Sequence, residues 1–186
     1  MRSVQRESLL DYVSYETERE VLRADVLRIK ALRRVHVAGV LTFLFENTAT
    51  IRYQVQEMMR AERIVRETDI RHELTTYNEL LGGPGELGCT LLIEIDDAEE
   101  RKKRLEEWIL LPAALYVRLP TGKKVRATCD PRQIGETRLS SVHYLKFDVR
   151  GEVPWAIGCD HPGLTAETEL GAATRTALAE DLASDL

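Results

Sequence analysis

The sequence has too few cysteines for a disulfide scaffold and no apolar run long enough to span a membrane. Its 3 cysteines, Cys89, Cys129 and Cys159, form no CxxC pair, so neither a disulfide framework nor a zinc ribbon is expected. No stretch approaches the roughly 18 apolar residues that a spanning helix needs. The first twenty residues also lack the apolar core of a signal peptide. We therefore expect a cytoplasmic protein without a membrane partner.

Positive charge is scarce relative to negative charge. The chain has 26 lysines and arginines against 31 aspartates and glutamates, a formal net charge of -5. That balance argues against nucleic acid as a partner, because its binding needs an excess of basic residues. The length of 186 residues fits one domain, and the 44% hydrophobic and 31% charged residues are ordinary for a folded protein.

The net charge is concentrated at the C-terminal end. After Cys159 the only basic residue is Arg175, whereas six residues are acidic: Asp160, Glu167, Glu169, Glu180, Asp181 and Asp185. Without these residues the totals fall to 25 of each sign, so residues 1–159 are neutral. The segment is interpreted either as a solvated acidic helix or as an acidic surface that docks a basic partner.

Periodicity and turn residues predict an α+β fold in one domain, 1–186, with N-terminal helices, a mostly antiparallel β-sheet and a C-terminal helix. Helical patterns cover 16–34, 50–66, 67–80, 96–110 and 170–182. Strand patterns cover 35–45, 89–95, 115–119, 123–128, 141–149 and 153–158, with a hairpin around 120–122. The glycine-rich loop 82–88 separates a helix-rich part, 1–81, from a strand-rich part, 88–169, and the C-terminal helix lies within 170–186.

Two predicted helices carry carboxylates on their apolar faces. Glu62 falls near the middle of an arc formed by Ile51, Val55, Met58, Met59 and Val65. A buried carboxylate must be paired or protonated, and Arg66 is the ordinary partner for Glu62.

The first helix repeats this pattern with Glu18 and Asp25, and Arg28 is one turn from Asp25. If these helices pack together with a third that carries His72, then Glu18, Asp25, Glu62 and His72 form a candidate site for Fe, Mn or Zn.

Sequence signatures of common enzyme classes are absent. Residues 82–88 contain glycines without GxGxxG spacing or a P-loop lysine, and neither GxSxG nor HExxH occurs. Cys159 and His161 lie two residues apart at a predicted strand end, which is a weak metal-site pattern. The sequence therefore favours a non-catalytic protein.

Several segments together resemble a known family. These are Phe43–Asn47, Gln54–Met58, Tyr77–Asn78, Pro84–Leu87, Thr90–Glu94, Asp130–Pro131 and Asp160–Pro162, with Arg138, Tyr144 and Phe147. In this order, and over nearly the whole chain, they resemble the bacterial domain-of-unknown-function family 3501. The family has no established activity.

The resemblance implies a genomic context and a set of residues to consider. Genes of this family often neighbour those of rubrerythrin-like proteins and of an iron–sulfur protein that resembles a heterodisulfide-reductase subunit. This context implies a role near peroxide handling or electron transfer. The pocket candidates are Glu46, Asn47, Gln54, Glu57, Arg60, Glu62, Asp130, Arg138 and His161.

Three functions are consistent with these observations. The first is a non-catalytic accessory or binding protein of a redox, iron–sulfur or peroxide-stress system. The second is a metal-dependent enzyme or sensor that uses the helix-borne carboxylates. The third is a structural homodimer in which the polar residues only fix the fold.

Overall fold

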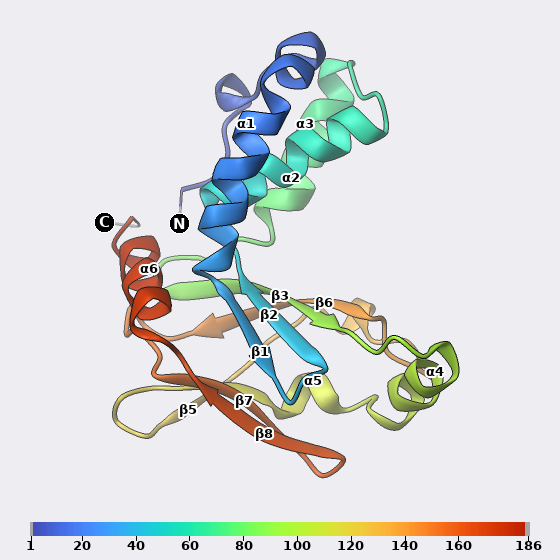
Figure 1. The fold of residues 1–186 in the computed structure, drawn as a ribbon, viewed down its shortest axis with the longest axis vertical. Helices are drawn as coiled ribbons and strands as arrows, with labels where there is room; N and C mark the ends of the chain where they lie inside the picture. Colours follow the sequence, from blue (N-terminus) through green and yellow to red (C-terminus); the bar gives the residue numbers. More distant parts are fainter. Residues whose placement is uncertain (1, 185–186) are drawn as a thin grey trace.

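The computed structural model describes residues 2–184, which form a three-helix unit standing on a β-sandwich (Figure 1). The α-helices are α1 (Tyr12–Ala31), α2 (Thr48–Ala61), α3 (Glu67–Asn78), α4 (Ala98–Glu107), α5 (Leu111–Ala114) and α6 (Ala172–Ala183). The strands are β1 (Arg34–Val37), β2 (Leu41–Phe45), β3 (Glu86–Ile93), β4 (Leu115–Arg118), β5 (Lys124–Arg126), β6 (Val142–Asp148), β7 (Ala156–His161) and β8 (Leu164–Glu169). Short 3-10 turns η1 (Arg6–Ser8) and η2 (Pro131–Gln133) complete the chain.

Eight strands form two antiparallel sheets. The first sheet has the order β1-β2-β3-β6 and the second has the order β5-β4-β7-β8. The sheets also meet at both flanks: Thr128 and Lys146 exchange backbone hydrogen bonds of 2.9 and 2.8 Å, and the Thr168 hydroxyl donates to the carbonyl of His36 at 3.0 Å. These contacts partly close the sandwich, and the predicted α+β class is confirmed.

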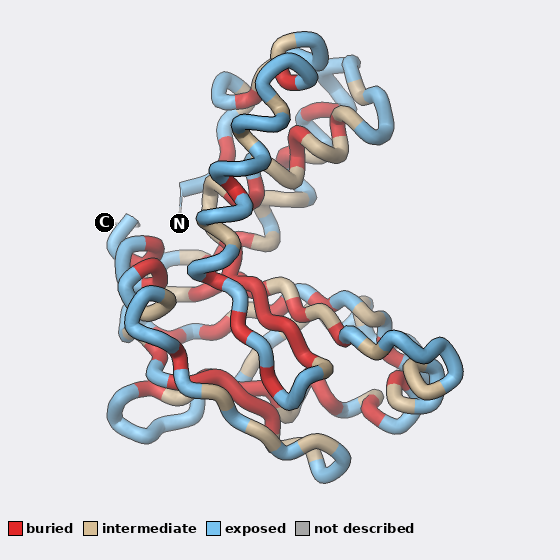
Figure 2. Tube along the Cα trace, in the orientation of Figure 1, coloured by how far each residue is buried: buried red, intermediate tan, exposed pale blue. Residues whose placement is uncertain are grey.

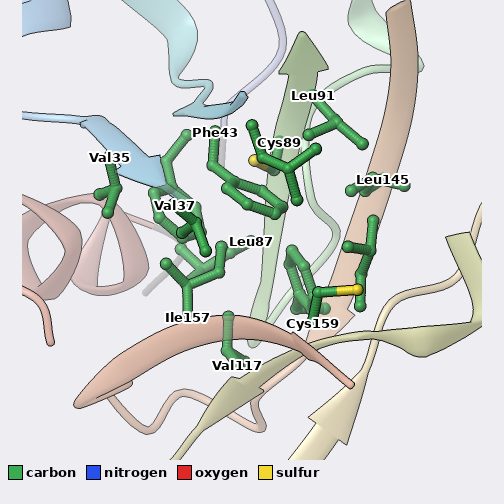
Figure 3. Packing of buried hydrophobic residues seen from close by; sticks show 14 of the residues in the cluster. Val35, Val37, Phe43, Leu87, Cys89, Leu91, Val117, Leu145, Ile157 and Cys159 are labelled. Atoms are coloured by element: carbon green, nitrogen blue, oxygen red, sulfur yellow. The ribbon is translucent and has the colours of Figure 1, made fainter. Parts of the chain in front are cut away.

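The main hydrophobic core lies between the two sheets. Phe43, Leu91 and Leu145 from the first sheet face Val117 and Ile157 from the second (Figure 3). Side chains alternate between the two faces of a strand, so every second residue enters this core. The opposite face of the first sheet therefore carries the remaining residues of β1, β2, β3 and β6, and it is turned toward the helices (Figure 1).

The helical unit has its own smaller core. Ile51, Val55 and Met59 of α2 pack with Ile70 and Leu74 of α3. Buried segments, red in Figure 2, accordingly occur in the helical unit as well as in the sandwich. Two helix starts are capped by side chains: Asp11 accepts hydrogen bonds from the first turn of α1, and Asn47 and Thr50 form a reciprocal capping box on α2. The molecule thus contains two cores, and the space between them is set by the connections from α1 to β1 and from α3 to β3.

A buried ion pair fastens α6 to the junction of the two units. The Arg33 guanidinium donates to the Asp181 carboxylate through Nε at 2.7 Å and Nη2 at 2.9 Å, and Asn47 Nδ2 donates to the same carboxylate at 3.0 Å. The side chains of Arg33 and Asp181 are 7% and 8% exposed, so solvent screens this pair very little. Helix α6 therefore holds together the end of α1 and the start of α2.

Three acidic residues of the C-terminal segment form ion pairs within the protein. Asp160 pairs with Lys124 and Arg126, Glu167 pairs with Arg118, and Asp181 pairs with Arg33. The idea of a uniformly solvated acidic helix is therefore wrong for these three residues. Glu169 and Glu180 remain exposed, and Asp185 lies outside the described residues.

Three details of the predicted secondary structure are wrong. Residues 35–45 form the hairpin β1–β2 rather than one strand, because Ala38 and Gly39 take left-handed conformations with φ of 54° and 71°. This hairpin pairs with β3, which begins at Glu86, so the last three residues of the predicted loop 82–88 belong to a strand. Strand β8 was not expected, whereas the hairpin β4–β5 is confirmed.

Candidate functional site

A cleft of about 240 Å³ lies where the helical unit meets the outer face of the first sheet. Its floor is a row of side chains at equal register across the four strands: Arg34, Leu44, Thr90 and Tyr144. Leu92 and Val142 extend the floor by one further row. Residues from α1, α2 and the end of α3 form the opposite wall, so the cleft exists only because the two units are joined at this angle.

Glu46 is the buried carboxylate of the cleft. It follows β2 directly, and its residue is 7% exposed. Thr50 of α2 donates its hydroxyl to one carboxylate oxygen at 2.5 Å, and Thr90 of β3 donates to the other at 2.6 Å. Because both oxygens accept a hydrogen bond, the carboxylate is held in one orientation and its burial is compensated.

Lys30 and Arg34 bring positive charge to the same cleft. Lys30, in the last turn of α1, places its ammonium 5.2 Å from the centre of the Tyr53 ring. Burial lowers the pKa of Lys30 below its ordinary value of 10.5, and the nearby Glu46 charge opposes this shift. Within residues 2–184, neither the Lys30 nor the Arg34 side chain forms an ion pair.

Phenol and amide groups complete the polar lining. Burial raises the pKa of Tyr77, while a hydrogen bond from the Gln54 side chain opposes the shift. Tyr144 lies on the floor, close enough to Tyr77 to interact with it electrostatically. The cleft therefore combines two cations, one fixed carboxylate, two phenols and an amide with apolar side chains, which is the composition of a small-molecule site.

A series of hydrogen-bonded polar side chains lies along the neighbouring row of the sheet. His36 Nδ1 lies 2.8 Å from the Thr42 hydroxyl, and that hydroxyl is hydrogen-bonded to Glu94. The Glu94 carboxylate is therefore bound within this row of hydrogen bonds, and Glu94 does not line the cleft. Glu46 consequently remains the only carboxylate among the described residues that line the cleft.

Three of the pocket candidates hold helices together instead of facing a pocket. Asn47 caps α2 and binds Asp181. Glu57 accepts hydrogen bonds from the Tyr15 hydroxyl at 2.6 Å and from Arg19 Nε at 2.8 Å, which links α1 to α2. Arg60 makes a second link between these helices, since its Nε donates to Glu16 at 2.6 Å.

The candidates from the strand-rich part are spread over three separate places. Asp130 caps η2, pairs with Arg132 and lines a hollow of about 490 Å³ that adjoins the cleft at Tyr144. Arg138 lies on the exposed loop before β6. His161 ends β7, and its Nδ1 accepts a hydrogen bond from the Gly163 amide at 3.1 Å. Of the nine pocket candidates, only Glu46 and Gln54 line the cleft.

The proposed set of metal ligands does not come together. Glu18, Asp25, Glu62 and His72 are all exposed, and Asp25 pairs with Arg28 as the simpler interpretation held. Helix α2 ends at Ala61, so Glu62 caps the helix and the helical spacing that placed it on the apolar face no longer applies. Val21 and Val65, expected to be buried beside these residues, are 68% and 71% exposed. In the described part of the chain, no three His, Cys, Asp or Glu side chains are arranged to hold a metal ion.

The three thiols are poor nucleophiles at neutral pH. Burial raises the pKa of Cys89, Cys129 and Cys159 above the ordinary value of 9.0, and the neighbouring Glu46 charge adds to the effect on Cys89. The thiolate is the reactive form, so a raised pKa reduces the reactive fraction.

Two residues of the cleft had no distinguishing sequence feature. Lys30 and Arg34 look like ordinary surface residues at the end of a charged helix. The register of the four strands would have placed Arg34 in one row with the other floor residues. That register depends on the β1–β2 turn, which the sequence pattern did not reveal. Tyr77, Thr90 and Tyr144 all belong to the segments that carry the family resemblance.

The fold and the cleft define an α+β protein with a helical unit, a two-sheet sandwich and a binding-site-like cleft between them. The chain belongs to the family described as Protein of unknown function (DUF3501), whose model matches residues 3–182. A search of curated proteins found no match. A crystal structure of a protein of unknown function from Burkholderia pseudomallei K96243 is similar, with a TM-score of 0.89 and 29% sequence identity over 97% of this chain and 100% of that chain. Among residues 2–184, no helix is long and apolar enough to cross a membrane.

Proposed function

We propose that this protein is a non-catalytic accessory protein that binds a small molecule in the cleft between the helical unit and the first sheet. The observation that carries the proposal is the lining of the cleft: Lys30, Arg34, Glu46, Gln54, Tyr77 and Tyr144 converge there from three helices and the sheet. Glu46 is fixed by two hydroxyls, and no cysteine, serine or histidine is among the described residues that line the cleft, so the lining favours binding over covalent chemistry.

The proposed setting is a redox, iron–sulfur or peroxide-stress system, which the family resemblance implies. In that setting the partner is an iron–sulfur protein or a rubrerythrin-like protein. The partner class has its support in the resemblance alone, and the cleft supports the binding role. A direct binding experiment therefore needs to test the partner separately from the small molecule.

A pull-down tests the partner prediction. The full chain is immobilised, and the purified iron–sulfur and rubrerythrin-like proteins encoded in the same genome are passed over it. We expect the iron–sulfur protein, the rubrerythrin-like protein or both to be retained at micromolar concentrations. If an acidic surface contributes, Glu169→Gln with Glu180→Gln should weaken retention, because these are the described acids of the segment that form no internal ion pair. Retention of neither protein would contradict the accessory role.

A structural homodimer is the second candidate, and exposed apolar residues on α1 favour it. Val13, Val21 and Leu27 are 72%, 68% and 46% exposed on this helix. A second copy that packs along α1 would remove these three side chains from water. Analytical ultracentrifugation of the free chain, beside the pull-down, distinguishes the two functions. A stable dimer that retains neither partner protein in the pull-down supports the structural role.

A further inference from the structure

The charged groups that face the cleft leave one positive charge in excess. Lys30 and Arg34 are cationic, and within residues 2–184 neither has an ion-pair partner. Glu46 is the one carboxylate of the lining, and its two oxygens already accept the hydroxyls of Thr50 and Thr90. The carboxylate is therefore held in place by neutral donors, and the guanidinium of Arg34 remains available to an incoming anion.

Apart from Gln54 and Thr90, the rest of the lining is apolar or aromatic. Leu44, Leu92, Val142 and the ring of Tyr144 form the floor, and Tyr77 faces them from α3. A volume of about 240 Å³ corresponds to roughly eight water molecules at their liquid volume. That space suits one ring or a short branched chain, and a bare inorganic anion would leave the apolar part of the cleft wet.

We propose that the cleft binds a small carboxylate with an aromatic or branched apolar body. The carboxylate group lies between Lys30 and Arg34, and the apolar body lies on the floor against Leu92 and Val142. This inference rests on the proposed binding function and adds the chemical class of the ligand. Partial burial of Lys30 strengthens its interaction with an anion, because charges attract more strongly where water is excluded.

Benzoate is a suitable probe, because it combines a carboxylate with a ring of the right size. Isothermal titration of the full chain with benzoate, its neutral analogue benzamide and inorganic phosphate separates the contributions of charge and ring. We expect benzoate to bind with a dissociation constant of about 1 mM or lower and benzamide to bind at least about tenfold more weakly. Phosphate is expected to bind more weakly than benzoate, since it makes no use of the apolar floor.

Variants of the two cations test where the probe binds. Lys30→Met keeps the apolar stem of the side chain, and Arg34→Gln keeps polarity; each should weaken benzoate binding about tenfold and leave benzamide binding unchanged. Lys30→Arg retains the charge and should stay within about threefold of the wild type, as should the remote control Lys102→Met on α4.

Each alternative outcome is informative. Equal binding of benzoate and benzamide, or benzoate binding that Lys30→Met and Arg34→Gln leave intact, overturns the proposal. Phosphate binding as tight as benzoate binding, lost in the same variants, makes the cleft a plain anion site and overturns the aromatic or apolar body. If no probe binds while the pull-down retains a partner, the carboxylate ligand is rejected and the accessory role stands.

Discussion

Asp181→Ala is expected to lower the free energy of unfolding by about 3–5 kcal/mol. The substitution leaves the Arg33 guanidinium buried without the carboxylate that accepts its two hydrogen bonds of 2.7 and 2.9 Å. It also removes the acceptor of the Asn47 side chain, which caps α2. Urea unfolding followed by far-ultraviolet circular dichroism measures the loss.

Two companion variants separate the ion pair from other effects of mutating α6. Glu180→Gln, at the exposed neighbouring position, should change stability by less than about 0.5 kcal/mol. The double variant Arg33→Met with Asp181→Leu replaces both charges with apolar groups and should recover most of the loss, because a buried pair is often no more stable than its apolar substitute. A double variant as unstable as Asp181→Ala would show that packing, and not the unpaired charge, is responsible.

Gly88→Ala is expected to destabilise the protein by about 1–3 kcal/mol, because the backbone at the junction of the units has no room for a side chain. A Cβ at Gly88 would lie 2.1 Å from the carbonyl oxygen of Leu80 and 2.9 Å from the amide nitrogen of Gly82. The end of α3 would have to move away from β3. Tyr77 and Leu80, on the wall of the cleft, would move with it.

Gly83→Ala is the matched control, five residues earlier in the segment that leads into β3. Its Cβ would meet the flexible end of the Glu86 side chain at 3.1 Å, and that side chain can move. Thermal unfolding of both variants should therefore show a clear loss for Gly88→Ala and a small change for Gly83→Ala. A loss for Gly88→Ala as small as that for Gly83→Ala would mean that β3 accommodates a side chain at Gly88 and that its close approach to Leu80 does not determine the junction.

The sequence predicted the elements of the fold better than their arrangement. Helical periodicity and turn residues identified most helices and strands, and capping by Asp11 and Asn47 follows general rules. The reversal at Ala38 and Gly39 was missed because Ala-Gly is not a common hairpin turn and the flanking residues form a continuous β-like run. This one turn makes β1 pair with β2, and β2 in turn pairs with β3.

The prediction that one apolar face of α1 is buried was wrong for a different reason. Its spacing predicts a buried stripe, but only Tyr15 and Val26 of the helix are buried in the described structure. Helix α1 packs mainly on α2, and most of its residues are exposed. A periodic pattern shows which residues share a face, and it does not show whether another element covers that face.

The candidate site was predicted in part. The family resemblance selected Glu46 and Gln54, which line the cleft, and it also selected Asn47, Glu57 and Arg60, which join helices. Residues of both kinds are polar and lie close together in sequence. Only the three-dimensional arrangement distinguishes a side chain that faces a cleft from one that fastens two helices.

Competitive labelling of amines across a pH series shows whether Lys30 lies in a site that receives an anion. Burial lowers the pKa of Lys30, with Arg34 acting in the same direction and Glu46 and Glu57 opposing it. Its amine therefore loses its proton at a lower pH than an ordinary lysine side chain does. We predict a labelling midpoint below 10.5 for Lys30, and a rise of this midpoint with slower labelling when benzoate is added, because a nearby anion favours the charged amine. A midpoint at 10.5 that benzoate leaves unchanged would contradict the account.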